Sequence, residues 1–321
     1  MRIKWFTILF YIMILFLFIL FFKKIIILRN ESEYSLNHYS NIFNFGSNVL
    51  KQQEGFIQKE KFLVKTNKEI YDPFYVEIYD EINKTPKRIK KELSIITNIT
   101  QADYDHSYFL DIGSGTGFAV NELSELGYNA FGIDQSKAMI EYSEKKYPSS
   151  QYKCGDVEEP LMFDNGNFTH VLCLYYTIYQ FKDKAAFFRN CYHWLQPGGY
   201  MIIHLVEPDK FDMSIPSAKH FLFGSPKKIN DERNKDSIVD FSHFQYKSSF
   251  NDSGSQFIHT ETFKDKKTNH IRQNEEILYI DKIQDILYLA MNSGFTLKSK
   301  VDLKSSMMDQ YQYLYLFERM L

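Results

Sequence analysis

The hydrophobic and polar positions divide the chain into an apolar amino-terminal run, a polar stretch and a long region of strand and helix patterns. Residues 5–22 carry no charge and, as a helix rising about 1.5 Å per residue, would span roughly 27 Å, the thickness of a bilayer core. Lys23 and Lys24 follow, where a cleaved signal peptide would have small residues. We therefore expect a transmembrane anchor at 1–29, with a cleaved signal peptide or a buried core helix as alternatives.

Polar residues dominate the next stretch, 30–70, whose Asn, Ser, Gln, Lys and Glu content predicts a linker or stalk. Beyond it, apolar runs of strand length alternate with segments of helical character, which predicts an α/β domain over 71–321. We divide this domain into an amino-terminal cap, a central core, an inserted segment and a carboxyl-terminal helix with an edge hairpin, at 71–106, 107–208, 209–280 and 281–321.

Composition narrows the range of functions. The chain is 44% hydrophobic and 17% aromatic, which is enough for a packed core. Its 40 acidic and 38 basic residues nearly cancel, so we expect no nucleic-acid partner. Cys154, Cys173 and Cys191 show no metal-ligand spacing and indicate a reducing compartment. Cys173 stands in an apolar run, where a buried thiol is expected and a catalytic cysteine is the alternative.

The most informative segment is a glycine-rich turn between a predicted strand, 108–112, and a predicted helix, 119–126. Gly113, Gly115 and Gly117 alternate with other residues in this turn. Glycines let the backbone take positive φ and approach a ligand closely, while the following helix offers unpaired N–H groups. Such a turn can cradle a nucleotide-like cofactor.

Two positions near the turn distinguish the cofactor classes that use this geometry. A dinucleotide fingerprint needs Gly or Ala at the sixth position from Gly113, but Phe118 stands there. Asp111, just before the turn, suits a cationic amino-acid moiety and would repel a pyrophosphate. The turn therefore favours S-adenosylmethionine over NAD.

A second acid ends the next predicted strand. Asp134 closes the strand 129–134, where a carboxylate can accept both ribose hydroxyls of the cofactor. Gln135 beside it is placed to touch the adenine edge. The alternative is that Asp134 only caps the amino terminus of a helix predicted at 136–146.

The segment 109–117 resembles motif I of class I S-adenosylmethionine-dependent methyltransferases, and the later landmarks of that family follow in order. Residues 152–158 resemble the third landmark, in which an acid accepts from the adenine amino group, and Asp156 and Val157 match it; a surface loop acid is the alternative. The segments 168–179 and 190–203 complete the pattern. The resemblance implies cofactor contacts from Asp111, Gly113, Gly115, Gly117, Asp134, Gln135, Asp156, Val157 and Leu174.

The same resemblance implies a Rossmann-like seven-stranded sheet of order 3-2-1-4-5-7-6, with helices on both faces and an antiparallel β insertion after strand 5. Alternating polar and apolar residues at 239–246, 255–263 and 270–280 predict three antiparallel strands in this insertion. Similar insertions cover the acceptor pocket in small-molecule methyltransferases. The segment 208–237 has no clear period.

Aromatic residues mark the expected acceptor side. The segment from Tyr71 to 80 resembles the amino-terminal cap of small-molecule N-methyltransferases, which implies that Tyr71 reaches over the donor or the acceptor. Alternatively, Tyr71, Tyr75 and Tyr79, four residues apart, form one helix face packed on the core. We expect Tyr75, Tyr175 and Tyr179 to contact the acceptor.

A catalytic base is needed by some acceptors only, since a neutral amine needs none at the attack step while a hydroxyl or carbon acceptor usually does. His204, at the end of the strand that starts at Tyr200, is the candidate base, and a packed histidine is the alternative. His204 and Glu207 are unlikely partners on one strand face, so we expect no metal.

These patterns predict an enzyme that transfers a methyl group from S-adenosylmethionine to a small-molecule acceptor, most readily an amine. The alternatives are a non-catalytic membrane-tethered domain that binds a nucleotide or a partner, and an NAD-dependent reductase. Because S-adenosylmethionine is a cytosolic metabolite, we expect a single-pass membrane protein with its catalytic domain facing the cytosol. The sequence leaves the oligomeric state open.

Overall fold

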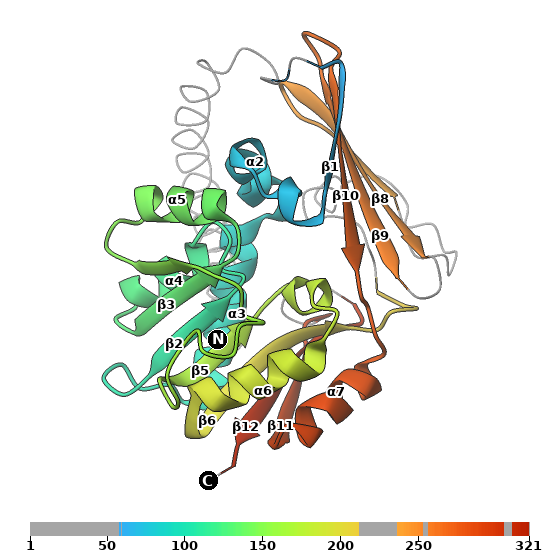
Figure 1. Ribbon diagram of the computed structural model, residues 1–321. Coiled ribbons are helices and arrows are strands. Elements are labelled where there is room, and N and C mark those ends of the chain that lie inside the picture. The colour runs from blue at the N-terminus through green and yellow to red at the C-terminus, as the bar shows by residue number, and fades with distance from the viewer. Residues whose placement is uncertain (1–57, 59, 212–235, 253–255, 305–309, 321) are drawn as a thin grey trace, which may run out of the picture. The chain divides into compact units, whose positions relative to one another are not determined.

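A seven-stranded sheet organises the folded part of the chain, with the strand order β11-β12-β6-β5-β2-β3-β4 (Figure 1). The computed structural model describes residues 58, 60–211, 236–252, 256–304 and 310–320. When the seven strands are numbered in chain order, their order in the sheet is 3-2-1-4-5-7-6, which confirms the prediction. The strands are β2 (Tyr108–Ile112), β3 (Asn129–Asp134), β4 (Gln151–Cys154), β5 (Phe168–Cys173), β6 (Leu195–Val206), β11 (Phe295–Asp302) and β12 (Gln312–Arg319).

The central strands of this sheet run in the same direction. Strand β2 pairs in parallel with β3 and β5, β3 with β4, and β5 with β6. Strand β12 is antiparallel to both β6 and β11, which is the expected edge hairpin. The carboxyl ends of β2, β3, β4 and β5 therefore meet at one edge, where open α/β sheets bind their ligands.

Helices cover both faces of the sheet, as predicted, because successive strand residues point to opposite sides. Leu110 belongs to a core cluster that includes residues of α6 (Lys184–Trp194) and α7 (Ile283–Asn292). Its neighbour Phe109 belongs to a second cluster with residues of α3 (Thr85–Thr100) and α4 (Phe118–Glu125). Strand residues that are apolar on both sides thus allow the sheet to be buried between two helical layers.

The amino-terminal cap consists of two helices. Helix α2 (Pro73–Asn83) begins after Asp72, whose side chain accepts a hydrogen bond from Tyr75 N. It ends at Lys84, which adopts a left-handed conformation with φ of 48°. Helix α3 starts directly afterwards, so this single residue redirects the chain.

A second, separate sheet has five strands in the order β1-β10-β9-β8-β7 (Figure 1). Four of its strands come from the predicted insertion and are antiparallel: β7 (Asp236–Asp240), β8 (Phe244–Asp252), β9 (Phe257–Asp265) and β10 (Ile271–Leu278). The sequence predicted three strands because 239–246 alternates without a break. In the structure a tight turn divides that segment, and Phe241 N donates to Phe244 O across it.

The fifth strand of this sheet, β1 (Phe62–Thr66), lies within the range predicted to be a linker, 30–70. It pairs in parallel with β10, from Phe62 opposite Ile271 to Thr66 opposite Glu275. A short 3-10 helix, η1 (Asn67–Ile70), then leads to α2. The end of the expected linker is therefore part of the insertion sheet. Strand β1 was not predicted because it stands in a polar stretch without a clear strand pattern.

The predicted membrane location has to be corrected. Across the described ranges, no helix combines the length and the apolar character needed to cross a bilayer. The segment expected to be the anchor, 1–29, lies outside those ranges, as does most of the expected linker. The expectation of a single-pass protein with its catalytic domain facing the cytosol is therefore withdrawn.

Candidate functional site

The glycine-rich turn joins β2 to α4 at the carboxyl edge of the sheet. All three of its glycines have positive φ, with 68° at Gly113, 52° at Gly115 and 78° at Gly117. These are left-handed conformations that side chains rarely tolerate. Gly117 is also the N-cap residue of α4 and, being glycine, supplies no side chain to the helix N–H groups. These groups are thus available to a ligand.

The surroundings of the three glycines differ, and the difference indicates where a ligand fits. A Cβ atom on Gly113 would lie 2.6 Å from Thr177 Cγ2, and one on Gly117 would lie 2.5 Å from Ser143 Cβ. A Cβ atom on Gly115 would meet its nearest side chain, the ring of Tyr79, only at 3.9 Å. Two glycines are therefore required by packing, and Gly115 borders open space.

Asp134 lies directly beside this turn, at the end of β3. Its Oδ2 accepts a hydrogen bond from Gly115 N at 2.9 Å, and its Oδ1 accepts from Ser136 N at 2.8 Å. Helix α5 (Lys137–Lys146) is capped by the Ser136 hydroxyl, which accepts from Met139 N, and not by Asp134. Each carboxylate oxygen retains a further lone pair, so Asp134 can also accept from a ligand hydroxyl.

Asp111 is the buried acid at the start of the turn. Burial raises its pKa to about 8, and the nearby carboxylates of Asp134 and Glu92 act in the same direction, while Arg88 opposes them. Burial also raises the pKa of Asp134, against the hydrogen bonds from Ser136 N and Gly115 N. A cationic ligand at this place would favour the charged form of both acids.

The other predicted cofactor contacts lie at the ends of the neighbouring strands. Gln135 follows Asp134, and Leu174 follows β5 as a buried residue. Val157 is buried after β4, where its carbonyl accepts from Asn190 Nδ2 at 2.9 Å. Asp156 Oδ2 accepts from Lys68 Nζ at 3.0 Å. Burial raises the pKa of Asp156, but hydrogen bonds from Glu158 N and Lys68 outweigh it and leave that pKa lowered.

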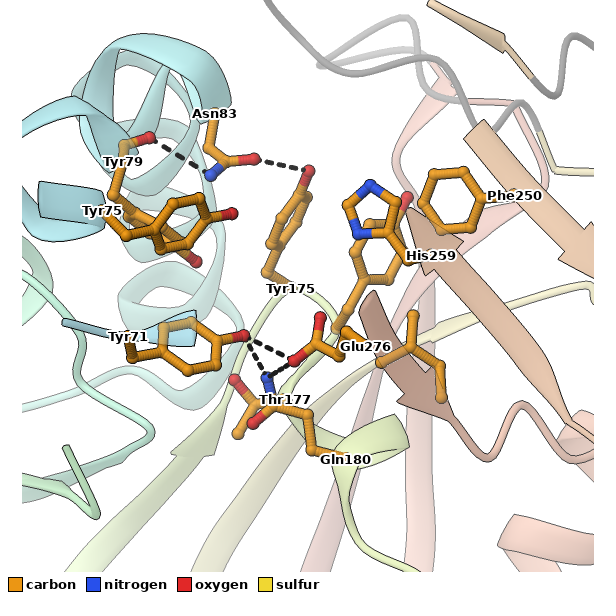
Figure 2. A pocket seen from close by; sticks show the side chains of 12 residues that line it. Tyr71, Tyr75, Tyr79, Asn83, Tyr175, Thr177, Gln180, Phe250, His259 and Glu276 are labelled. Atoms are coloured by element: carbon orange, nitrogen blue, oxygen red, sulfur yellow. Dashed lines mark hydrogen bonds between the residues drawn. The ribbon is translucent and has the colours of Figure 1, made fainter. Parts of the chain in front are cut away.

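A pocket opens next to the glycine turn and encloses about 540 Å³, counting its open mouth (Figure 2). Helix α2, the loop after β5 and the insertion sheet all contribute to its wall. Three of the predicted residues, Tyr71, Tyr75 and Tyr175, line it. The full set is Tyr71, Tyr75, Tyr79, Asn83, Tyr175, Tyr176, Thr177, Gln180, Phe250, His259, Glu276 and Leu278.

A carboxylate with two donors stands in this wall. Tyr71 Oη donates to Glu276 Oε1 at 2.6 Å, and Gln180 Nε2 lies 2.9 Å from the same oxygen (Figure 2). Gln180 Nε2 also donates to Tyr71 Oη at 2.6 Å. Burial raises the pKa of Glu276 to about 7, and burial likewise raises the pKa of Tyr71 well above its usual value. Tyr71 is thus a neutral donor at physiological pH.

A buried carboxylate, Glu261, organises the wall behind the pocket. Its Oε1 accepts from Tyr75 Oη at 2.9 Å and from Tyr246 Oη at 2.7 Å. Its Oε2 accepts from Asn274 Nδ2 at 3.1 Å. These bonds join helix α2 to three strands of the insertion sheet and fix the Tyr75 ring in the pocket wall.

Two predicted residues do not line the pocket. His204 is fully buried in β6, where its Nε2 lies 3.0 Å from Gln312 Oε1 and its Nδ1 lies 3.8 Å from Glu92 Oε1. This position corresponds to the alternative of a packed histidine. Tyr179 is also fully buried, and its hydroxyl accepts from Val206 N at 2.8 Å. Tyr179 therefore supports the core behind the pocket wall.

Sequence reasoning missed Glu276, Gln180, Asn83 and His259, all of which line the pocket. One signal was present in β10, where Arg272, Asn274 and Glu276 alternate along one face of the strand. Charged and amide side chains at alternate positions of a half-buried strand indicate a polar interior. Within the described ranges, no group of three or more His, Cys, Asp or Glu residues could hold a metal ion.

The comparison with known sequences identifies the core. Residues 110–203 match a protein-family model described as "Methyltransferase domain". A ubiquinone biosynthesis O-methyltransferase of Bradyrhizobium sp. (strain ORS 278) is 30% identical over 124 residues, which are 37% of this chain and 48% of the relative. The chain thus spans about half the length of this curated relative.

Solved structures extend the likeness to most of the described chain. An S-adenosylmethionine-dependent methyltransferase from Clostridium acetobutylicum superposes with a TM-score of 0.58 at 17% identity, covering 77% of this chain and 98% of the other. An amino pentose methyltransferase from Micromonospora echinaspora, solved with S-adenosylmethionine bound, gives 0.50 at 16% identity over 71% and 90%. At such identities the likeness establishes the fold. Together with the family match, it shows that this chain contains a catalytic methyltransferase domain of the class I fold, with S-adenosylmethionine as its methyl donor.

Proposed function

We propose that this domain transfers the methyl group to the nitrogen of a small-molecule amine held in the pocket of Figure 2. The observation that carries the proposal is that the pocket adjoins the glycine turn. Tyr79 lines the pocket and is also the side chain nearest to a Cβ atom on Gly115. Thr177 likewise lines the pocket and packs against Gly113. An acceptor in the pocket would therefore lie beside a cofactor in the turn.

The chemistry of the pocket wall favours a cationic acceptor. Five tyrosine rings line it, and their faces attract ammonium groups. Tyr71 and Tyr75 meet edge to face with ring centroids 5.7 Å apart, and Tyr75 and Tyr79 repeat this arrangement at 5.7 Å. The carboxylate of Glu276 adds a negative charge. A neutral hydroxyl compound would gain less from these groups than an amine.

On the cofactor side, we propose the roles implied by the resemblance. Asp134 accepts the ribose hydroxyls, Asp111 faces the cationic amino-acid part, and Asp156 with the Val157 backbone contacts the adenine. The turn glycines, Gln135 and Leu174 complete this set. When bound, S-adenosylmethionine supplies a methyl group on a sulfonium, which is transferred in line. The chain's own contribution is alignment and exclusion of water, which can lower a barrier by roughly 7–11 kcal/mol.

The names of similar proteins point to two acceptor classes. The Bradyrhizobium relative is an O-methyltransferase by its name. The family match, 110–203, leaves out Tyr71 and Glu276 and so does not reach two walls of the pocket. The amino pentose methyltransferase shares the fold over 71% of this chain and acts on an amino sugar by its name. The composition of the pocket supports the second class.

Calorimetry with the full chain tests the cofactor part of the proposal. S-adenosylmethionine and S-adenosylhomocysteine should both bind, and NADH should not. Asp134→Ala should weaken both ligands by about 5-fold to 150-fold, because two hydrogen bonds to hydroxyls are lost at about 0.5–1.5 kcal/mol each. The matched control is Glu144→Ala, since Glu144 is an exposed acid on α5 and its removal should leave both affinities unchanged. Equal affinities in Asp134→Ala and the wild type would contradict the proposed role of Asp134.

Transfer of labelled methyl groups tests the acceptor part. The full chain should label primary and secondary amines in preference to alcohols and phenols of the same carbon skeleton. Labelling of alcohols or phenols alone would favour the O-methyl transfer named for the Bradyrhizobium relative.

A further inference from the structure

Among the twelve described side chains that line the pocket, Glu276 is the one carboxylate. It stands on β10, opposite His259 of β9, and is half-buried. Tyr71 and Gln180 both meet its Oε1. Figure 2 shows the other carboxylate oxygen directed into the pocket. The residue is thus fixed by two donors at one oxygen and presents the second to a ligand.

We propose that Glu276 is the catalytic proton acceptor of the reaction, an inference that rests on the proposed amine acceptor. The Glu276 carboxylate takes one proton from the ammonium form of the acceptor, and the N–H electron pair stays on nitrogen. That pair forms the new N–C bond to the donor methyl group while the C–S bond breaks and its electron pair stays on sulfur. Glu276 then releases its proton to solvent through the open mouth.

The other ionisable groups near the pocket are less suited to this role. Tyr71 keeps its proton and donates a hydrogen bond to Glu276, and burial raises the pKa of Tyr79 above its usual value. Glu261 is engaged by Tyr75, Tyr246 and Asn274 behind the wall. His259 lies flat on Phe250, with ring centroids 4.2 Å apart, and its Nε2 lies 2.8 Å from Ser248 Oγ.

The surroundings of Glu276 bring its pKa close to neutral pH. Burial raises its pKa to about 7, the hydrogen bond from Tyr71 lowers it, the charge of Glu261 raises it, and Gln180 lowers it. The ionisable side chains around it are Tyr79 on α2, Tyr71 just before α2, and Glu261 and His259 on β9. A base with a pKa near the working pH is both ionised enough to act and basic enough to hold a proton.

The test uses benzylamine as the acceptor probe, benzyl alcohol as its uncharged counterpart and the full chain. In the wild type, kcat/KM for benzylamine should fall as the pH drops through about 7, because Glu276 becomes protonated. Glu276→Gln should lower kcat/KM at pH 7 by about 100-fold or more. Its defect should shrink as the pH approaches the pKa of the amine, since the free amine then arrives without the extra proton.

A matched control and a second variant separate this role from a structural one. Glu275 is the preceding residue on β10, so its side chain points to the opposite face of the sheet, where it pairs with Gln273. Glu275→Gln should keep the wild-type pH profile. Tyr71→Phe removes a hydrogen bond that lowers the pKa of Glu276, so the acid limb should move to higher pH while the alkaline plateau remains.

Binding gives a readout that does not depend on turnover. Calorimetry of benzylamine binding to the protein saturated with S-adenosylhomocysteine, at pH 6.5 in two buffers of different ionisation enthalpy, counts the protons released. The wild type should release a fraction of a proton as the ammonium ionises Glu276, and Glu276→Gln should release none. The proposal is overturned if Glu276→Gln keeps the acid limb of the pH profile or still releases protons. It is also overturned if His259→Gln loses both features while Glu276→Gln keeps them. If the wild type methylates benzyl alcohol or neither probe, the amine acceptor itself is wrong, a result visible without any substitution.

Discussion

Asp111 is the residue at which ligand binding and stability are most directly opposed. It is buried, and three other ionisable side chains, Glu92, Asp134 and Arg88, shape its charge. Its pKa of about 8 means that the folded protein holds a proton there that an unfolded chain would release near pH 4. Residues placed for a charged ligand commonly reduce the stability of the ligand-free protein.

The stability of the ligand-free protein should therefore depend on pH through Asp111. Between about pH 4 and pH 8 the folded form binds more protons at this site than the unfolded form, so the contribution of the site falls as the pH rises, by up to about 1.4 kcal/mol per pH unit. Asp111→Asn cannot titrate and should gain stability relative to the wild type from pH 5 to pH 8, while it binds S-adenosylmethionine more weakly. Urea unfolding at the two pH values measures the first effect.

The control for this comparison is Asp164→Asn, because Asp164 is an exposed acid in the loop before β5. The stability difference between this variant and the wild type should be independent of pH. A parallel response of the Asp111 and Asp164 variants would show that burial does not perturb Asp111.

The residues proposed for the cofactor side could be nominated from the sequence because their signals are local. Asp111 and the glycines stand within one turn, and Asp134 ends the next strand, where the structure places it against Gly115. The acceptor side could not be predicted this way. Glu276 bonds to Tyr71 across 205 positions of sequence and to Gln180 across 96. Only the folded insertion brings these three side chains together.

At the level of elements, helix α2 is tied to the insertion sheet by a buried ion pair. Arg272 of β10 donates two hydrogen bonds to Asp72, at 2.9 and 2.8 Å, and a third to Ile70 O at 2.9 Å. Its guanidinium lies 4.7 Å from the centroid of the Phe74 ring. Since Asp72 also caps α2, the pair fixes the start of the helix that carries Tyr75 and the position of Tyr71, which directly precedes the cap.

Breaking this pair should loosen the whole pocket wall. Arg272→Met keeps the length of the side chain but leaves the Asp72 carboxylate without its counter-ion. We expect a loss of about 3 kcal/mol in unfolding free energy, at the low end for buried pairs since Asp72 is 26% exposed. Lys266→Met is the matched control, because the Lys266–Asp240 pair is exposed and should contribute about 0–1 kcal/mol. Denaturant unfolding measures both values, and equal losses would contradict the difference in burial.

The sequence located those elements whose hydrophobic pattern runs without interruption from end to end. Sequence patterns predicted β2, β5 and β6, because each is apolar along most of its length and is buried between the helical layers. They also predicted the edge hairpin. The insertion was only partly resolved, since β7 and β8 alternate as if they were one strand. Strand β1 was missed because its partner, β10, is about two hundred residues away. Short strands in polar surroundings depend on such distant pairing for their stability.

At the level of the whole described unit, two sheets share one pocket, and the bonds across it cross-link them. Tyr71 and Gln180 reach Glu276, and Tyr279 N donates to Tyr179 O at 2.7 Å just after β10. Lys184 adds a hydrogen bond to Tyr279 O at 2.8 Å from the helix layer of the core. These links connect the insertion sheet to the core at several points, so the two are expected to open together and not separately.

Cofactor binding should therefore protect the insertion sheet as well as the core. A ligand at 100 times its Kd adds about 2.7 kcal/mol to the free energy of global unfolding, which slows hydrogen exchange about 100-fold wherever opening is global. With S-adenosylhomocysteine at that level, amides of Ile271–Leu278 in β10 should slow by the same factor as those of Ile283–Asn292 in α7. Tyr71→Phe should reduce the effect in β10 alone, because it removes one of the cross-links. If β10 exchanges at the same rate with and without ligand while α7 slows, the insertion sheet opens independently of the core. The hydrogen bonds of Glu276 with Tyr71 and Gln180 would then not be enough to make the two sheets unfold together.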